Sequence, residues 1–188
     1  MSPDELANWR IRLGQLGGVL FLFLAQPRLR LLFLAGFLIA LLGEAVRLWA
    51  AGTIKKNKEL AREGPYALVR HPLYLGSFLI VAGLTLASFN PYRFFRTLAV
   101  WALALGGFAW LYRRKMADEE AKISQLFGAE FEGYRRSTPM FWPDFRNKAA
   151  LRGGVFDLGQ ALKNREHHAV FGVLGVAAVL WMKLIYQL

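Results

Sequence analysis

Five apolar stretches, separated by polar connections, organise the chain. They run roughly over Leu13–Ala25, Leu29–Ala51, Leu73–Phe89, Thr97–Tyr112 and Ala169–Tyr186. A membrane-spanning helix needs about 20 apolar residues, so the second and fifth stretches are long enough, the third and fourth are marginal, and the first is short. Because their apolar residues are continuous rather than alternating, the stretches indicate helices. The pattern predicts an all-α integral membrane protein with about five transmembrane helices.

The basic residues gather on one side of this arrangement. Of the 24 Lys and Arg residues, 19 lie before the first stretch, between the end of the second stretch (from Arg47 on) and the third, or between the fourth and fifth. Loops on the cytoplasmic side carry an excess of basic residues. We therefore expect the N-terminus and both long loops in the cytoplasm, in a bacterial inner membrane or the endoplasmic reticulum. This topology explains the formal net charge of +11, so no nucleic acid partner is expected.

The segment Glu63–Leu79, EGPYALVRHPLYLGSFL, places constrained and charged residues where the third stretch begins. Pro72 suits the first turn of a helix, which puts His71 at the N-cap. Helix N-termini offer free N–H groups and partial positive charge, and Arg70 adds a full charge. The alternative is a rigid loop with interfacial Arg70 and Tyr74. The run of constrained residues favours a ligand site.

A second candidate segment, Arg113–Tyr134, has a helical period. Glu120 falls on an apolar stripe, with apolar residues four before it and three and seven after it. A carboxylate on a core-facing stripe is costly unless a cation or a hydrogen-bond donor meets it. Glu119, in contrast, has Lys115 four residues earlier and can pair with it on a solvated face. We expect Glu120 to contact a ligand or a catalytic partner.

Other polar residues give weaker signals. Glu44 and Arg47 are three apart and can pair on one helix face; they make either a salt bridge near a helix end or the lining of a polar cavity. His167 and His168 are adjacent and point to different helix faces, which makes a poor metal pair. Because the chain also has no cysteine, no metal site is expected.

Two motifs, GPYALVRHPLYLG and DEEAKISQLFGAEFEGYRRSTPMFWP, resemble the isoprenylcysteine carboxyl methyltransferase family and its phospholipid N-methyltransferase relatives. The resemblance covers about residues 36–143. It implies an integral membrane enzyme that encloses S-adenosylmethionine between the two motifs at the cytosolic face, with S-adenosylhomocysteine as the product. The implied cofactor-binding residues are Gly64, Pro65, Tyr66, Leu68, Val69, Arg70, His71, Tyr74, Gly76, Glu119 and Glu120.

The chain departs from this family in two places. The carboxyl methyltransferases carry an arginine, thought to hold the substrate, where this chain has Lys115, which is a poorer bidentate carboxylate clamp. Arg114 is adjacent, and we expect Arg114, Lys115 and Glu120 to be catalytic. The family also ends near residue 143, which divides the chain into a methyltransferase core, 1–143, and an extension, 144–188, with an amphipathic segment and the last transmembrane helix. The extension could wall the site or build a homodimer.

The expected function is methyl transfer from S-adenosylmethionine to a lipid-like or prenylcysteine carboxylate acceptor, with membrane lipids as partners. Two alternatives stay open from the sequence. One alternative acceptor is a phospholipid amine or a thiol, which must lose a proton and therefore favours a base. The other alternative is a non-catalytic lipid-binding membrane protein that keeps the loop for its shape.

Overall fold

The structure, a computed structural model, describes residues 3–55, 59–146 and 153–187. Within these ranges the chain is helical and has no β-strand, which confirms the all-α prediction. The elements are α1 (Pro3–Leu24), α2 (Arg30–Thr53), η1 (Gly64–Ala67), α3 (Pro72–Ala87), η2 (Pro91–Arg93), α4 (Phe94–Phe127), α5 (Ala129–Ser137), α6 (Leu158–Lys163) and α7 (Glu166–Tyr186), where η marks a 3₁₀-helix.

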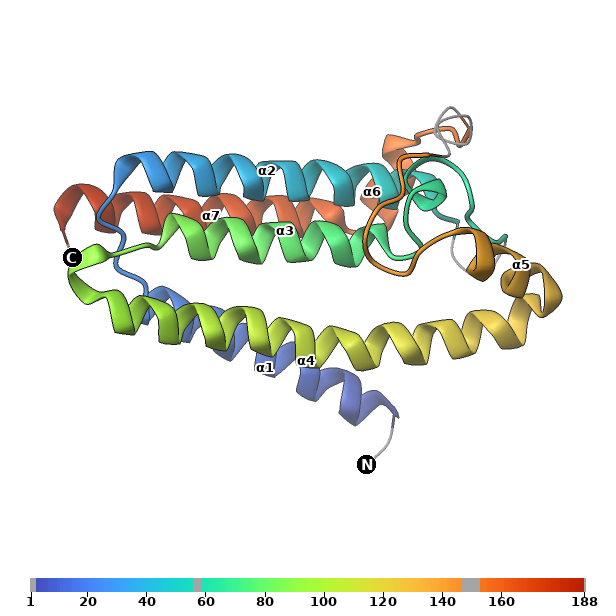
Figure 1. The fold of residues 1–188 in the computed structure, drawn as a ribbon, viewed down its shortest axis with the longest axis horizontal. Helices are drawn as coiled ribbons and strands as arrows, with labels where there is room; N and C mark the ends of the chain where they lie inside the picture. Colours follow the sequence, from blue (N-terminus) through green and yellow to red (C-terminus); the bar gives the residue numbers. More distant parts are fainter. Residues whose placement is uncertain (1–2, 56–58, 147–152, 188) are drawn as a thin grey trace.

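The helices run lengthwise in one elongated bundle (Figure 1). Helices α2, α3 and α7 lie side by side, and α4 runs along them with α1 crossing it. The α1–α2 and α3–α4 connections and the C-terminus gather at one end. The turn η1 and helices α5 and α6 lie at the other end, which we call the basic end because it carries the long basic connections.

Among the residues that the structure describes, three helical segments are long and apolar enough to cross a membrane: Arg30–Thr53, Pro91–Phe127 and Glu166–Tyr186. Two shorter apolar helices, Gly14–Leu24 and Pro72–Ala87, coincide with the first and third predicted stretches. The integral membrane class is therefore supported by length and composition. The count of five spans stays a prediction.

Helix α4 joins two segments that the sequence analysis treated separately. It runs for 34 residues, from the fourth apolar stretch into the Arg113–Tyr134 segment. It ends where Gly128 takes a φ of 51° and a ψ of −124°, a conformation that residues with a side chain avoid. Helix α5 starts directly after this break and turns back toward η1 (Figure 1).

Glycines allow α2 and α3 to approach closely. A Cβ atom built on Gly76 would lie 2.5 Å from the carbonyl oxygen of Gly43, and one on Gly83 would lie 2.4 Å from that of Gly36. Both distances are shorter than van der Waals contact, so only glycine permits this spacing. The crossing fixes the start of α3, and with it Arg70 and His71, relative to α2.

The extension completes both ends of the bundle. At the basic end, the Asn164 side chain donates to the carbonyl of Ala51 at 2.7 Å and the Gln160 side chain to that of Ile54 at 3.2 Å, which satisfies carbonyls that a helix end leaves free. At the opposite end, Lys183 Nζ donates to the carbonyl of Ala25 at 2.7 Å. The extension is therefore packed on α1 and α2, while the domain boundary at residue 143 stays a prediction.

Candidate functional site

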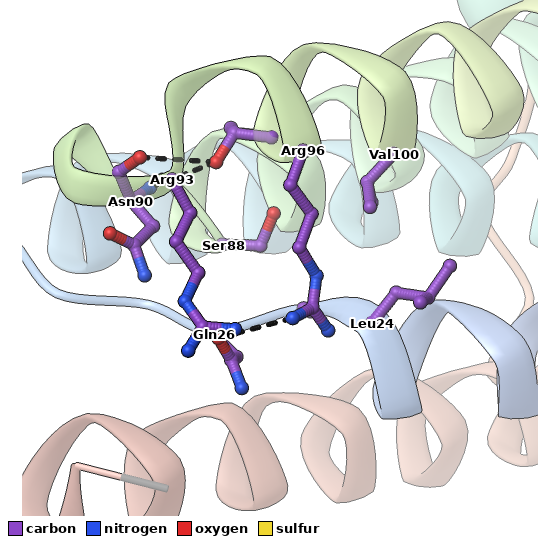
Figure 2. Close-up of a pocket in the computed structure, with 9 residues that line it drawn as sticks. Leu24, Gln26, Ser88, Asn90, Arg93, Arg96 and Val100 are labelled. Atoms are coloured by element: carbon purple, nitrogen blue, oxygen red, sulfur yellow. Dashed lines mark hydrogen bonds between the residues drawn. The ribbon is translucent and has the colours of Figure 1, made fainter.

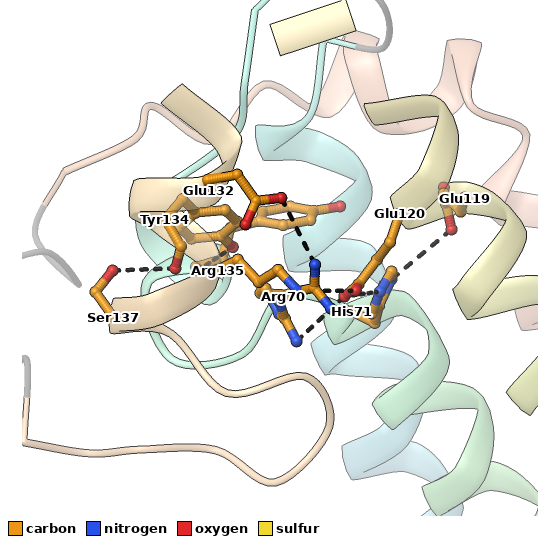
Figure 3. Close-up of polar contacts among 9 residues, drawn as sticks. Arg70, His71, Glu119, Glu120, Glu132, Tyr134, Arg135 and Ser137 are labelled. Carbon is orange, nitrogen blue, oxygen red and sulfur yellow. Dashed lines mark hydrogen bonds and ion pairs between the residues drawn. The ribbon is translucent and has the colours of Figure 1, made fainter. Parts of the chain in front are cut away.

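Glu120 lies at the centre of a charged cluster at the basic end (Figure 3). Its Oε1 atom is 3.3 Å from Arg70 Nη2 and 3.2 Å from His71 Nε2, and its Oε2 atom is 3.9 Å from Arg135 Nε. The side chains of Glu120 and Arg70 are only 12% and 10% exposed. The carboxylate therefore meets two arginines and a histidine, of which Arg70 and His71 come from the opposing motif, while its contact with a ligand stays a prediction. We call Arg70, His71, Glu119, Glu120 and Arg135 the Glu120 cluster.

The start of α3 positions two of these residues. Pro72 occupies the first turn of α3, and His71 is its N-cap, as the sequence predicts. The carbonyl of His71 accepts the first backbone hydrogen bonds of the helix. One residue earlier, the backbone N–H of Arg70 donates to the carbonyl of Pro139 at 2.9 Å. The segment after α5 therefore fixes the backbone from which both side chains project.

Two further contacts hold α5 and the segment after it against η1. The phenol of Tyr134 donates to the carbonyl of Tyr66 at 2.7 Å, and the backbone N–H of Asp144 donates to the carbonyl of Leu68 at 2.9 Å. Burial raises the pKa of both tyrosines above the usual range, so both phenols stay neutral and keep their protons as donors.

His71 is 5% exposed. Burial lowers its pKa, although the carboxylates of Glu119 and Glu120 oppose part of this effect. A neutral ring carries one proton, and the Glu120 carboxylate can only accept, so we assign that proton to Nε2. The Nδ1 atom then has a free lone pair and lies 3.8 Å from Glu119 Oε2. The unprotonated nitrogen can accept a proton, although the lowered pKa makes His71 a weaker base than a histidine in water.

Several buried polar atoms of this region have no hydrogen-bond partner. They are Nε and Nη1 of Arg70 and the phenol oxygen of Tyr66. A buried polar atom without a partner costs roughly 1–3 kcal/mol, so native proteins rarely leave several together. The Arg70 atoms lie next to Glu120, where they can bind water or a polar ligand.

An aromatic pair adjoins the cluster and holds Lys115. The Tyr74 ring lies 5.5 Å from that of His71 and 5.2 Å from that of Tyr112. Lys115 Nζ is 5.3 Å from the Tyr74 ring centroid and 5.8 Å from that of Tyr112, which is cation–π distance. Arg114, in contrast, lies over the ring of Trp110, a residue that is 60% exposed. Of the two candidates for acceptor binding, Lys115 is therefore the one that adjoins His71.

The remaining predicted cofactor residues fall into two groups. Gly64, Pro65, Leu68 and Val69 are buried in or just after η1, where they shape the backbone that leads to Arg70. Gly76 lies at the α2–α3 crossing, and a Cβ atom on it would be 2.6 Å from Arg47 Cγ. Whether these residues contact a cofactor stays a prediction.

The structure adds Arg135 and Tyr134, which the sequence analysis did not single out. Both lie on α5, which the fold brings back to the cluster only because the chain reverses at Gly128. The helical period continues through residue 134 and does not mark this reversal. The glycine between two helical runs was the signal that could have revealed it.

Of the two interpretations of Glu44 and Arg47, the salt bridge between them is not formed, because Arg47 pairs with Glu166 instead. Arg47 Nη2 lies 2.8 Å from Glu166 Oε2, and Arg47 Nη1 donates to Ser77 Oγ at 2.6 Å. Neither carboxylate oxygen of Glu44 has a hydrogen-bond partner. Helix α7 begins beside the last turns of α2, so it presents Glu166 to Arg47. The pairing is thus set by the extension rather than by spacing along α2.

In the described ranges, no group of three or more His, Cys, Asp or Glu side chains is arranged so that it could hold a metal ion. His167 and His168 stack on each other with ring centroids 4.2 Å apart. A separate cavity at the opposite end, between Gln26, Asn90 and Arg96, has a volume of about 10 Å³ (Figure 2). This is room for about one water molecule, and none of the predicted site residues lines it.

Comparisons with known proteins agree with the family resemblance expected from the sequence. Residues 31–116 match the family described as phospholipid methyltransferase, a range that includes Arg70 and His71 but ends before Glu119. The chain is 36% identical over 120 residues to the cobalt-zinc-cadmium resistance protein CzcN of Cupriavidus metallidurans, covering 63% of this chain and 50% of that protein. It is 29% identical over 137 residues to the protein-S-isoprenylcysteine O-methyltransferase of Schizosaccharomyces pombe, covering 73% of this chain and 52% of that protein.

The chain is also 35% identical over 114 residues to the nickel-cobalt-cadmium resistance protein NccN of Alcaligenes xylosoxydans xylosoxydans, covering 60% of this chain and 50% of that protein. It thus spans about half the length of the curated relatives it matches. No solved structure matches it significantly. The resemblance expected from the sequence is confirmed: residues 31–116 carry the phospholipid methyltransferase family pattern, and an isoprenylcysteine methyltransferase is among the relatives.

Proposed function

We propose that this chain is a membrane methyltransferase that uses S-adenosylmethionine and binds it at the Glu120 cluster, on the cytoplasmic side. The observation that carries the proposal is the contact of Glu120 with Arg70 and His71 across the two motifs, beside buried polar atoms that lack partners. The family match supports methyl transfer as the reaction class. The cofactor and its place rest on the chemistry of these side chains.

The side chains suit the polar groups of this cofactor. The unpartnered Nε and Nη1 atoms of Arg70 match a carboxylate. A carboxylate accepts about four hydrogen bonds, so Glu120 retains capacity for an ammonium or a ribose hydroxyl. The phenol of Tyr66 has no partner in its buried position and can serve as a further donor. When bound, the cofactor supplies an electrophilic methyl group on a sulfonium.

The chain contributes alignment and exclusion of water, which supply most of the rate in a displacement of this kind. Glu120 and His71 are both nearly buried, and η1, the start of α3 and the segment after α5 enclose them through the hydrogen bonds described above. These contacts fix the distance between the two walls of the site, which are η1 with the start of α3 on one side and the end of α4 with α5 on the other. A ligand between them would be shielded from solvent.

For the acceptor, we propose a lipid-like carboxylate, oriented by Lys115. The Lys115 ammonium lies over the rings of Tyr74 and Tyr112, so a positive charge and an apolar aromatic surface lie side by side. Such a surface suits a carboxylate attached to an apolar chain. One observation favours the alternative acceptor, a phospholipid amine or a thiol: His71 is neutral with a free Nδ1 atom and can take the proton that such an acceptor must lose.

Calorimetric binding of S-adenosylhomocysteine to the full chain in detergent tests the proposal. We expect the wild type to bind and Glu120→Gln to lose at least tenfold in affinity. Glu59→Gln, at an exposed carboxylate that pairs with Lys55, is the matched control and should bind like the wild type. A wild type without binding refutes the cofactor, and unchanged binding by Glu120→Gln refutes the site.

A transfer assay with a methyl-labelled cofactor then identifies the acceptor. Prenylcysteine, an aminophospholipid and a small thiol are supplied in parallel, and Lys115→Ala is compared with Arg114→Ala. Transfer to prenylcysteine that is lost in Lys115→Ala and kept in Arg114→Ala supports the carboxylate acceptor. Transfer to the amine or thiol that is lost in His71→Gln supports the alternative. Cofactor binding without transfer to any acceptor counts against both.

A further inference from the structure

An arginine-lined groove opens beside the Glu120 cluster. It has a volume of about 470 Å³ and is formed by the end of α5 and the segment that follows it. Its charged lining consists of four arginines and one aspartate: Arg70, Arg135, Arg136, Arg146 and Asp144. We call it the arginine groove. Its volume is within the range of small-molecule sites, and its excess of positive charge selects an anion.

Acidic side chains neutralise only part of this charge. The Arg146 guanidinium donates three hydrogen bonds to the Asp144 carboxylate. These hydrogen bonds lower the Asp144 pKa to about 2, so the pair remains ionised. Arg70 and Arg135 face Glu120, and Arg135 also lies 3.6 Å from Glu132.

Donors remain in the groove after these pairs are formed. Arg136 forms no ion pair with any acidic side chain in the ranges that the structure describes. Arg135 is 54% exposed, and its contacts with Glu120 and Glu132 are 3.9 Å and 3.6 Å long, so its guanidinium keeps donors for a ligand. Several guanidinium donors at one groove match a phosphate, which offers several acceptor oxygens.

Aromatic residues of the groove segment place it at the level of the membrane surface. The rings of Phe141 and Trp142 lie 5.6 Å and 6.2 Å from that of Phe78, which belongs to the second turn of the apolar helix α3. Trp142 lines the groove and is 69% exposed. An exposed tryptophan packed near the start of an apolar helix is typical of the membrane interface. The guanidinium groups beside it then lie at the depth of lipid phosphates.

We infer that the arginine groove binds the phosphate of an anionic phospholipid headgroup from the cytoplasmic leaflet. This site adjoins the proposed cofactor site, with which it shares Arg70 and Arg135, but lipid binding does not require the methyl transfer. Anionic lipids concentrate on that leaflet and attract basic residues at the membrane surface. Free phosphate offers the same oxygens without the acyl chains, which the apolar surface at Trp142 would contact.

Binding of dihexanoylphosphatidylglycerol to the full chain in a neutral detergent tests this inference, measured by calorimetry and by retention of the lipid in native mass spectrometry. The variant is Arg136→Gln/Arg146→Gln. Each basic residue near an anionic surface contributes roughly fivefold in affinity, so we expect the double variant to bind roughly 25-fold more weakly. The control Lys55→Gln/Lys122→Gln removes the same charge from exposed positions outside the groove and should bind like the wild type.

Two further ligands show how much of the affinity comes from the phosphate and how much from the acyl chains. Dihexanoylglycerol, which has the acyl chains without the phosphate, should not compete with the phospholipid, and inorganic phosphate should compete only weakly. Equal losses in the two double variants, no loss in either, or no lipid binding by the wild type would overturn the inference. Inorganic phosphate that binds as tightly as the lipid would overturn the lipid source. Thermal melting of each variant, expected to match the wild type, shows that the fold is intact.

Discussion

Replacing Gly76 by alanine distinguishes helix packing from cofactor contact at this position. The resemblance to the methyltransferase family places Gly76 at the cofactor, whereas the structure places it at the α2–α3 crossing. The added methyl group would lie 2.5 Å from the carbonyl oxygen of Gly43 and 2.6 Å from Arg47 Cγ. Ordinary contacts of this kind lie at 3.4–4 Å, so the helices must separate by the order of 1 Å or the Arg47 side chain must move. Overpacking of this kind costs about 1–3 kcal/mol.

The expected result is a lower melting temperature in detergent. For a chain of this size, 1 kcal/mol corresponds to about 2–4 °C, so Gly76→Ala should melt about 2–12 °C below the wild type. Gly83→Ala, at the same crossing but farther from the Glu120 cluster, should show a similar loss. Gly172→Ala is the control, because a Cβ atom there meets nothing within 4 Å. If Gly76→Ala melts like the wild type but no longer binds S-adenosylhomocysteine, the packing argument is wrong.

Three further changes probe the contacts around the site. Glu166→Gln leaves the partly buried Arg47 guanidinium without its counter-charge, and this loss should cost about 1–3 kcal/mol, which thermal melting measures. His71 has a folded pKa below its unfolded value of 6.5, so wild-type stability should be complete above about pH 6.5 and decline as the pH falls toward the folded pKa; melting temperatures across pH should decline less steeply in His71→Gln. Tyr134→Phe removes the hydrogen bond to the Tyr66 carbonyl and should destabilise the protein by about 1 kcal/mol.

Exposed counterparts provide the controls for these changes. Glu59→Gln breaks the surface pair with Lys55 and should cost less than about 1 kcal/mol. Tyr92→Phe alters a residue that is 87% exposed and should leave the melting temperature unchanged. Equal losses in a buried residue and its exposed counterpart, or identical pH profiles for the wild type and His71→Gln, would contradict the assignments.

Local rules predicted most of the helices. Continuous apolar runs marked α2, α3 and α7 to within a few residues, because such runs are helical in a membrane. Pro72 marked the start of α3, since proline fits the first turn and disfavours the helical conformation in the residue before it. The reversal at Gly128 was not predicted, because the apolar period of α4 continues into α5 and only the backbone of that one glycine changes.

Site residues that have a signal in the local sequence were predicted, whereas those that depend on long-range contacts were not. Glu120 was identified because its stripe is apolar, and Arg70 and His71 because of the helix start, both of which are local features. The contacts of Arg135 with Glu120 and of Glu166 with Arg47 were not predicted. Each acts on a residue far away in the sequence, and the contact depends on how whole helices are placed rather than on spacing along one of them.

The cofactor-site proposal requires more of the chain than the segment that matches the family. Residues 31–116 contain Arg70 and His71 but not Glu120, so this segment alone holds two donors without the carboxylate that they face. The second wall comes from the end of α4, and α5 returns to the first wall through the hydrogen bond from Tyr134 to Tyr66. The first wall in turn depends on α2, whose Arg47 is held by Glu166 from the extension. Variation in the segments after residue 116 can therefore change the geometry of the site while the family pattern stays intact.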